Sequence, residues 1–161
     1  MNSGQMMLVI LGAVILALLS LNVYKSSDIK ENSLTNNQSI IAGTGLAQAM
    51  MNEIKSRAFD QNTINAPVNS VASLTPPLLL GPDLGELIPT QFNDVDDFNN
   101  YTTSDTLNLF GIFNISVHVY YINTFSPGIK SLTQTFSKQV DISVTNSNIP
   151  FPLKFSQVIS Y

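Results

Sequence analysis

The side chains best suited to bind a ligand or to take part in a reaction lie in one short acidic run. Asp94, Asp96 and Asp97 fall within "NDVDDFNN", flanked by asparagines. Calcium takes six to eight oxygen ligands from carboxylates and amides of this kind. The run lacks the ordered spacing and the closing Glu of an EF-hand, and Asp residues also cap backbone N–H groups in solvated turns. The sequence therefore predicts either a calcium site at Asp94, Asp96 and Asp97 or a solvated acidic turn, and no other cofactor.

The single histidine, His118, raises the question of nucleophilic catalysis, because Ser116 lies two positions before it. Both residues fall on the same face of a predicted strand, and no Gly-x-Ser-x-Gly elbow is present. A surface histidine on a strand is therefore expected, and an enzyme is the least favoured class.

Three asparagines start N-x-S/T sequons: Asn37, Asn100 and Asn114. A chain so rich in Asn, Ser and Thr contains such triplets by chance, and their use depends on the host. They are candidate glycosylation sites.

The composition bounds the class of protein. The chain has 161 residues, of which 44% are apolar and 11% charged, with a net charge of −4 and no cysteine. Charged residues make up about 25% of an ordinary soluble domain. The seven basic residues are scattered, so no nucleic-acid partner is predicted. Without cysteine the chain has no disulfides, and something else must stabilise the domain if it is exported.

The elements that position these residues begin with an apolar block. Residues 6–21 carry no charge, and the block extends over 5–24 with Asn22 as its only strongly polar late member. A helix that spans a bilayer needs roughly 20 apolar residues. A cleaved signal peptide and a buried core helix are the alternatives. Lys25 and Lys30 follow the block, and by the positive-inside rule they alone would place the rest of the chain in the cytoplasm.

The next segment has the period of an amphipathic helix. Its apolar side recurs at steps of three and four: Ile40, Thr44, Ala47, Met51, Ile54 and Ala58. No proline separates it from the apolar block, so a long N-terminal helix over 1–59 is predicted. Gly43 and Gly45 cost helix propensity, which close helix packing or a kink would explain.

Residues 60–161 are predicted to form a globular head. Prolines break regular structure over 60–105, and antiparallel strands are predicted over 107–122, 136–145 and 153–161 by apolar–polar alternation. One face of this sheet needs a cover, and the amphipathic helix can provide it. The predicted fold class is α+β.

This architecture resembles that of type IV pilins and pseudopilins. Two segments carry the resemblance further: "GLAQAMMNEIKSRAFD" and "FNDVDDFNNY" are similar to segments of minor pilin-like proteins of the mannose-sensitive haemagglutinin pilus type. In that family a prepilin peptidase cleaves a basic leader after a glycine, and the fifth mature residue is usually Glu. Here Gly4 is the candidate cleavage glycine, Gln5 stands at position five, and the glutamate is absent. A leader that is missing here would carry the charges that place the head outside.

The resemblance implies a helical filament of identical subunits. The subunit would be anchored in the cytoplasmic membrane, meet the pilus assembly machinery and then become part of an extracellular filament. The residues expected in the filament core are Met6, Leu8, Val9, Leu11, Val14, Ile15, Leu18 and Leu19. Two alternatives remain open: a minor pilin or pseudopilin of a secretion or adhesion assembly, and a single-span membrane protein with a β-rich binding head.

Overall fold

The computed structural model describes residues 2–161 and shows one long helix and one antiparallel sheet. Helix α1 spans Ser3–Lys55, and no proline occurs before Pro67 to interrupt it. The strands are β1 (Thr102–Leu107), β2 (Gly111–Asn123), β3 (Ser126–Lys130), β4 (Ser137–Thr145) and β5 (Leu153–Ser160). The predicted α+β class is confirmed.

The chain divides into two compact units after Gln38. The sequence pattern predicts a boundary after residue 59, whereas residues 39–55 of α1 belong with the sheet because they share its core. We call residues 39–161 the sheet unit. In the other unit, Ser3–Ser27 form a helix long and apolar enough to cross a membrane, judged by length and composition.

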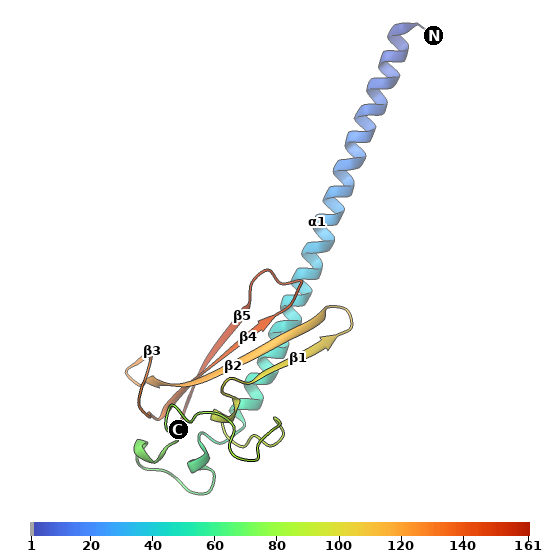
Figure 1. Ribbon diagram of the computed structural model, residues 1–161. Coiled ribbons are helices and arrows are strands. Elements are labelled where there is room, and N and C mark those ends of the chain that lie inside the picture. The colour runs from blue at the N-terminus through green and yellow to red at the C-terminus, as the bar shows by residue number, and fades with distance from the viewer. Residues whose placement is uncertain (1) are drawn as a thin grey trace. The chain divides into compact units, whose positions relative to one another are not determined.

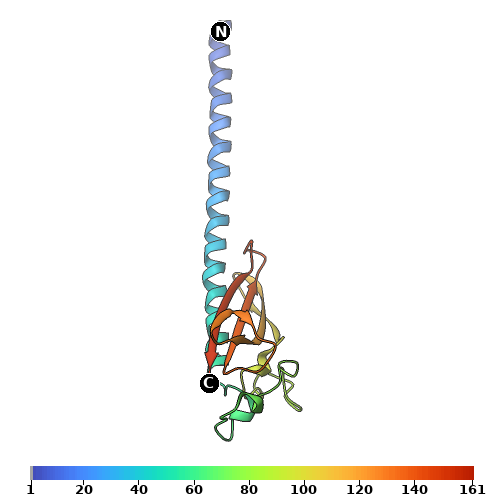
Figure 2. The same cartoon turned by 90° about the vertical axis from the view of Figure 1, so that its left-hand side faces the viewer.

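The sheet has the strand order β1-β2-β4-β5, with every pairing antiparallel, and β3 pairs with the end of β2 (Figure 1). Residues of β2 and β4 alternate between the two faces. The inward side chains are buried: Phe113, Ile115, Val117, Val119, Val140, Ile142 and Val144. They pack against Ala47 and Ile54 of α1 and form the core of the sheet unit. Figure 2 shows the strands beside the C-terminal part of α1.

The contact between α1 and the sheet is closest at Gly43. A Cβ atom there would lie 3.0 Å from Leu153 Cδ1 and 3.3 Å from Phe113 Cε1. At Gly45 a Cβ atom would meet nothing within 4 Å. Of the two explanations offered for these glycines, close packing therefore holds at Gly43, and α1 continues unbroken through both positions.

The strands differ from the prediction in two places: β3 lies outside every predicted strand, in a segment expected to be a turn, and the first predicted strand is interrupted. The sequence predicted a single strand over 107–122, whereas β1 ends at Leu107 and β2 begins at Gly111, whose φ of 79° suits a turn. β1 lies within the segment predicted to be irregular. Its residues are mostly exposed because it is an edge strand, so it lacks the alternating apolar pattern that marks a half-buried strand.

Candidate functional site

The apolar side chains of the N-terminal part of α1 are uncovered in the described chain. All eight residues predicted for a filament core are exposed, and the apolar window of Ser3–Ser27 has no buried share. Gly4 has no neighbour near its Cβ position, and Gln5 Oε1 accepts a hydrogen bond from the Asn2 backbone N–H at 3.4 Å. An apolar surface of this size needs lipid or protein around it.

The acidic run lies beside the end of α1. The backbone of Ala58 pairs with that of Asp94: Ala58 N–H donates to Asn93 O at 3.2 Å, and Val95 N–H donates to Ala58 O at 2.9 Å. Val95 and Phe98 are fully buried in the core. Because Val95 and Phe98 pack in the core, the neighbouring Asp94, Asp96 and Asp97 are buried rather than solvated.

Local hydrogen bonds hold two of the three carboxyl groups. Asp94 Oδ1 accepts from the backbone N–H groups of Asp96 and Asp97, at 2.8 and 3.2 Å. Asp97 Oδ2 accepts from the N–H groups of Asn93 and Asp94, at 2.8 and 3.0 Å. The expected capping by Asp side chains is thus present, and it takes place in a buried turn.

Asp96 instead contacts a lysine from the sheet. Lys138 Nζ lies 2.6 Å from Asp96 Oδ1 and 3.0 Å from Asp60 Oδ2, and it also donates to Phe59 O at 2.7 Å. The side chain of Lys138 has no exposed surface. We call Asp60, Asp94, Asp96 and Lys138 the buried ion cluster.

Asp60 is the most extensively bonded member of this cluster. It caps the 3₁₀ helix Gln61–Thr63, and Oδ1 accepts from Asn62 N–H and from Thr75 N–H and Oγ1. Tyr121 Oη lies 3.0 Å from Asp60 Oδ2. Burial alone would raise the pKa of Asp60, but the Lys138 charge and these hydrogen bonds outweigh it and hold the pKa below its usual value.

The pKa values of Asp94 and Asp96 are shifted in the opposite direction, above the usual value. Burial, together with the neighbouring Asp96 and Asp97, raises the pKa of Asp94 to about 9. Burial also raises the pKa of Asp96, against the pull of the Lys138 charge. The two carboxyl groups affect each other's pKa, and the Asp96 charge contributes to the raised pKa of Asp94. Asp94 Oδ2 is buried and has no hydrogen-bond partner among the described residues.

The three aspartates predicted to bind calcium therefore do not face one point in the described chain. Asp96 contacts Lys138, and Asp94 contacts Asp96. Asp97 belongs to a different group of acids: one of its carboxyl oxygens lies within 4.8 Å of one oxygen of Asp83 and one of Glu86. Glu86 Oε1 also accepts a hydrogen bond from Asn93 Nδ2. Asp83 is exposed and Glu86 is half-buried, and exposed acidic groups are common without an ion. Burial, together with neighbouring acids, raises the pKa of Glu86.

The remaining predicted residues lie on the surface of the sheet unit or of α1. His118 is exposed, and its Nδ1 lies 3.1 Å from Asn100 Oδ1. Asn37, Asn100 and Asn114 are all exposed. Ser116 lies on the same sheet face as His118 but contacts it through no hydrogen bond among those described.

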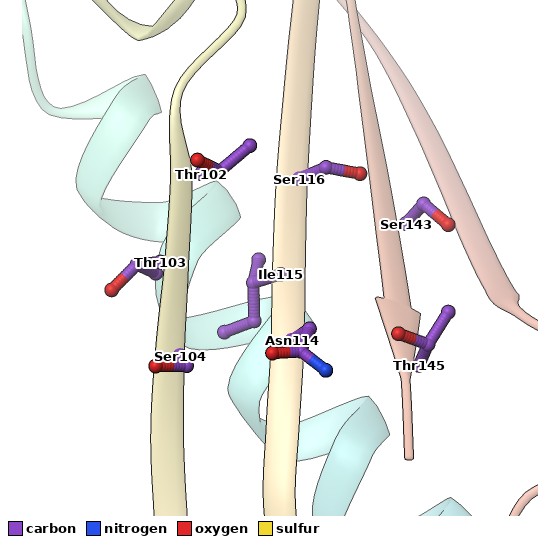
Figure 3. A pocket seen from close by; sticks show the side chains of 8 residues that line it. All are labelled: Thr102, Thr103, Ser104, Asn114, Ile115, Ser116, Ser143 and Thr145. Carbon is purple, nitrogen blue, oxygen red and sulfur yellow. The ribbon is translucent and has the colours of Figure 1, made fainter.

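The outer face of the sheet carries a shallow, hydroxyl-rich depression of about 490 Å³. Figure 3 shows its side chains on β1, β2 and β4, with Ile115 turned toward the helix behind the sheet. The lining residues are Thr102, Thr103, Ser104, Asn114, Ile115, Ser116, Ser143 and Thr145. It contains no titratable side chain, so it offers no catalytic group.

Lys138 is a member of the cluster that was not predicted from the sequence, although the sequence contains a signal for it. Val140, Ile142 and Val144 occupy the inward face of β4, and Lys138 has the same parity. A lysine at an inward position needs a buried carboxylate partner. The partners lie 42 and 78 positions away, so the pattern alone could predict that a partner exists but not which residue it is.

Comparison with known proteins gave no relative: no protein-family model, no curated protein and no solved structure matches this chain.

Proposed function

We propose that this chain is a structural subunit of a type IV pilus-like filament and that it polymerises through the apolar part of α1. The observation that carries the proposal is that one helix contributes to two very different environments. Residues 39–55 of α1 are packed into the core of the sheet unit, whereas the apolar side chains of Ser3–Ser27 have no cover in the described chain. The segments similar to those of pilin-like proteins support the same assignment.

A subunit of such a filament has its apolar helix in two different apolar environments, first in the membrane and then in the filament. Before assembly, lipid surrounds Ser3–Ser27, whose length suits a bilayer. After assembly, the same side chains pack against copies of themselves. Lipid tails and apolar side chains are similar environments, so the transfer of one helix from lipid to the filament lowers the free energy only slightly. The polymer therefore depends on many repeated contacts. A head-to-tail interface that does not close on itself produces a helical fibre.

Electron microscopy of material sheared from producing cells, with N-terminal sequencing of its main band, tests this proposal. Thin filaments that contain the chain are expected. The first residue of the band decides whether Gly4 is the cleavage glycine. A chain that stays entirely in the membrane fraction, in no filament, would overturn the filament proposal.

A charge placed on the apolar helix sharpens the test. Leu11→Lys is expected to abolish filaments, since a buried unpaired ammonium is costly among apolar helices. Thr124→Lys adds the same charge at an exposed turn between β2 and β3 and serves as the control. Circular dichroism of both variants in detergent must show an intact sheet unit. Filaments unchanged by Leu11→Lys would contradict burial of this helix.

A further inference from the structure

The buried ion cluster places an amine and a carboxyl group close enough to react with each other. Lys138 Nζ lies 2.6 Å from Asp96 Oδ1, the shortest of its three polar contacts, and the two side chains are 0% and 4% exposed. An ion pair this deeply buried is stable only where its desolvation is offset. An amide between the same two groups would remove both charges from the interior.

Aromatic rings surround the lysine nitrogen. It lies 4.6 Å from the centroid of Phe59 and 5.2 Å from that of Tyr121. In the β2–β4 pairing, Tyr121 is the register partner of Lys138, so the ring is held beside the lysine. These rings keep water from the nitrogen, and low water activity favours condensation over hydrolysis.

We propose that Lys138 and Asp96 condense spontaneously into an intramolecular isopeptide bond. The bond joins Nζ of Lys138 to Cγ of Asp96. It would link β4 to the 3₁₀ helix Asp96–Phe98 within the sheet unit. The proposal does not depend on the filament assignment.

The two other aspartates of the cluster have complementary roles in this reaction. Asp60 is kept ionised and lies 3.0 Å from Lys138 Nζ, so it can accept a proton from the ammonium group. Asp94 lies beside Asp96, whose backbone N–H donates to Asp94 Oδ1 at 2.8 Å, and its pKa is raised to about 9, so it can protonate the carboxyl group that must lose an oxygen. Asp60 itself is a poorer acyl partner, because Thr75, Asn62 and Tyr121 hold its ionised form.

The reaction balances without an oxidant or a cofactor. The amine of Lys138 attacks Cγ of Asp96, the new C–N bond forms, and one C–O bond breaks. Of the three ammonium protons, one stays on the amide nitrogen, and two leave with the Asp96 oxygen as water. Proton exchange through the cluster returns Asp60 to its ionised form and Asp94 to its protonated form.

Mass spectrometry of the full-length protein, extracted in detergent and digested with trypsin after denaturation, tests the proposal. The expected product is a branched species in which the fragment of residues 58–130 is joined to that of residues 131–154, lighter than their sum by one water. Cleavage after Lys138 should be lost. Using these fragments makes the result independent of any processing at the N-terminus or of filament formation.

Two variants separate this bond from other losses of water. Lys138→Arg keeps the positive charge but cannot form the link, so its fragments should have their full sequence mass. A cyclic imide at an aspartate would also lose water but would persist in Lys138→Arg. Lys154→Arg, at an exposed position of β5, should retain the bond. Asp94→Asn is expected to slow or prevent the reaction.

Folded wild-type protein that gives unlinked fragments and normal cleavage after Lys138 overturns the proposal. This outcome requires no variant to fold. It would leave the cluster as an ion pair and would not affect the filament assignment.

Discussion

Lys138 on β4 and Asp60, five residues beyond the end of α1, lie in contact at 3.0 Å, although 78 positions separate them in the sequence. Asp60 accepts from the side chain of Lys138, the backbone of Thr75 and the hydroxyl of Tyr121. A single carboxylate therefore connects the helix end, the proline-rich segment, β2 and β4.

Replacing this carboxylate should be costly. We expect Asp60→Ala to lower the free energy of unfolding by about 3 to 5 kcal/mol, because buried donors and Lys138 lose their common acceptor. Asp105→Ala, on the exposed edge strand β1, is the control and should change the free energy of unfolding by about 0.5 kcal/mol or less. Denaturant unfolding of the full chain in detergent, followed by tyrosine fluorescence, measures both. Equal effects of the two substitutions would show that Asp60 is not a central contact.

The hydroxyl of Tyr121 offers a finer probe of the same cluster. It lies 3.0 Å from Asp60 Oδ2 and 2.9 Å from Thr75 O, and the side chain is fully buried. We expect Tyr121→Phe to destabilise the protein by about 1 to 2 kcal/mol. Tyr120→Phe removes a hydrogen bond to Asp141 from the adjacent, partly exposed residue and should cost less. A larger loss for Tyr120→Phe would contradict the burial argument.

The raised pKa of Asp94 predicts a pH dependence with a definite sign. In the unfolded chain the pKa of this carboxyl group is near its usual value of 3.8, whereas in the folded protein its pKa is about 9. Between these values the folded state holds one more proton, so the contribution of Asp94 to stability falls as pH rises, by at most about 1.4 kcal/mol per pH unit.

An isosteric variant removes this titrating group. Asp94→Asn keeps an oxygen for the backbone N–H groups of Asp96 and Asp97 and replaces the acid proton with an amide donor. Its stability relative to wild type should therefore increase from pH 5 to pH 8. Thermal unfolding across this range measures the difference. A constant difference would mean that Asp94 is ionised in the folded protein.

Helix packing on the sheet gives a prediction far from the cluster. Gly43→Leu should destabilise the sheet unit by about 1 to 3 kcal/mol, because its side chain would overlap Leu153 and Phe113. Gly45→Leu introduces the same residue where the Cβ position is open, and the gain in helix propensity should raise stability. Thermal melting of the two variants should shift in opposite directions.

Local patterns predicted most of the regular structure. Proline-free periodicity predicted the helix, and alternation predicted the inward faces of β2 and β4, because both signals depend on near neighbours in the sequence. β1 escaped prediction because it is exposed at the sheet edge. The two units are also divided by contacts rather than by composition, since α1 passes through the boundary at Gln38 without a break.

The candidate site was only partly accessible from sequence. Asp94, Asp96 and Asp97 were singled out for their carboxyl groups, but Val95 and Phe98 decide that these groups are buried. The role of Asp96 depends on Lys138, which reaches it only after the sheet has formed. The identity of a partner 42 positions away follows from the tertiary fold and not from spacing.

The long sequence separations in the buried ion cluster also have a consequence for folding kinetics. The β2–β4–β5 meander closes through short connections, whereas Lys138 reaches Asp60 and Asp96 only after much longer loops close. Contacts of high contact order form slowly. We therefore expect the meander to form the folding nucleus and the segment between Asp60 and Tyr101 to dock last. During synthesis from the N-terminus, this segment emerges before β4, so its carboxylates have no lysine partner until Lys138 has been synthesised.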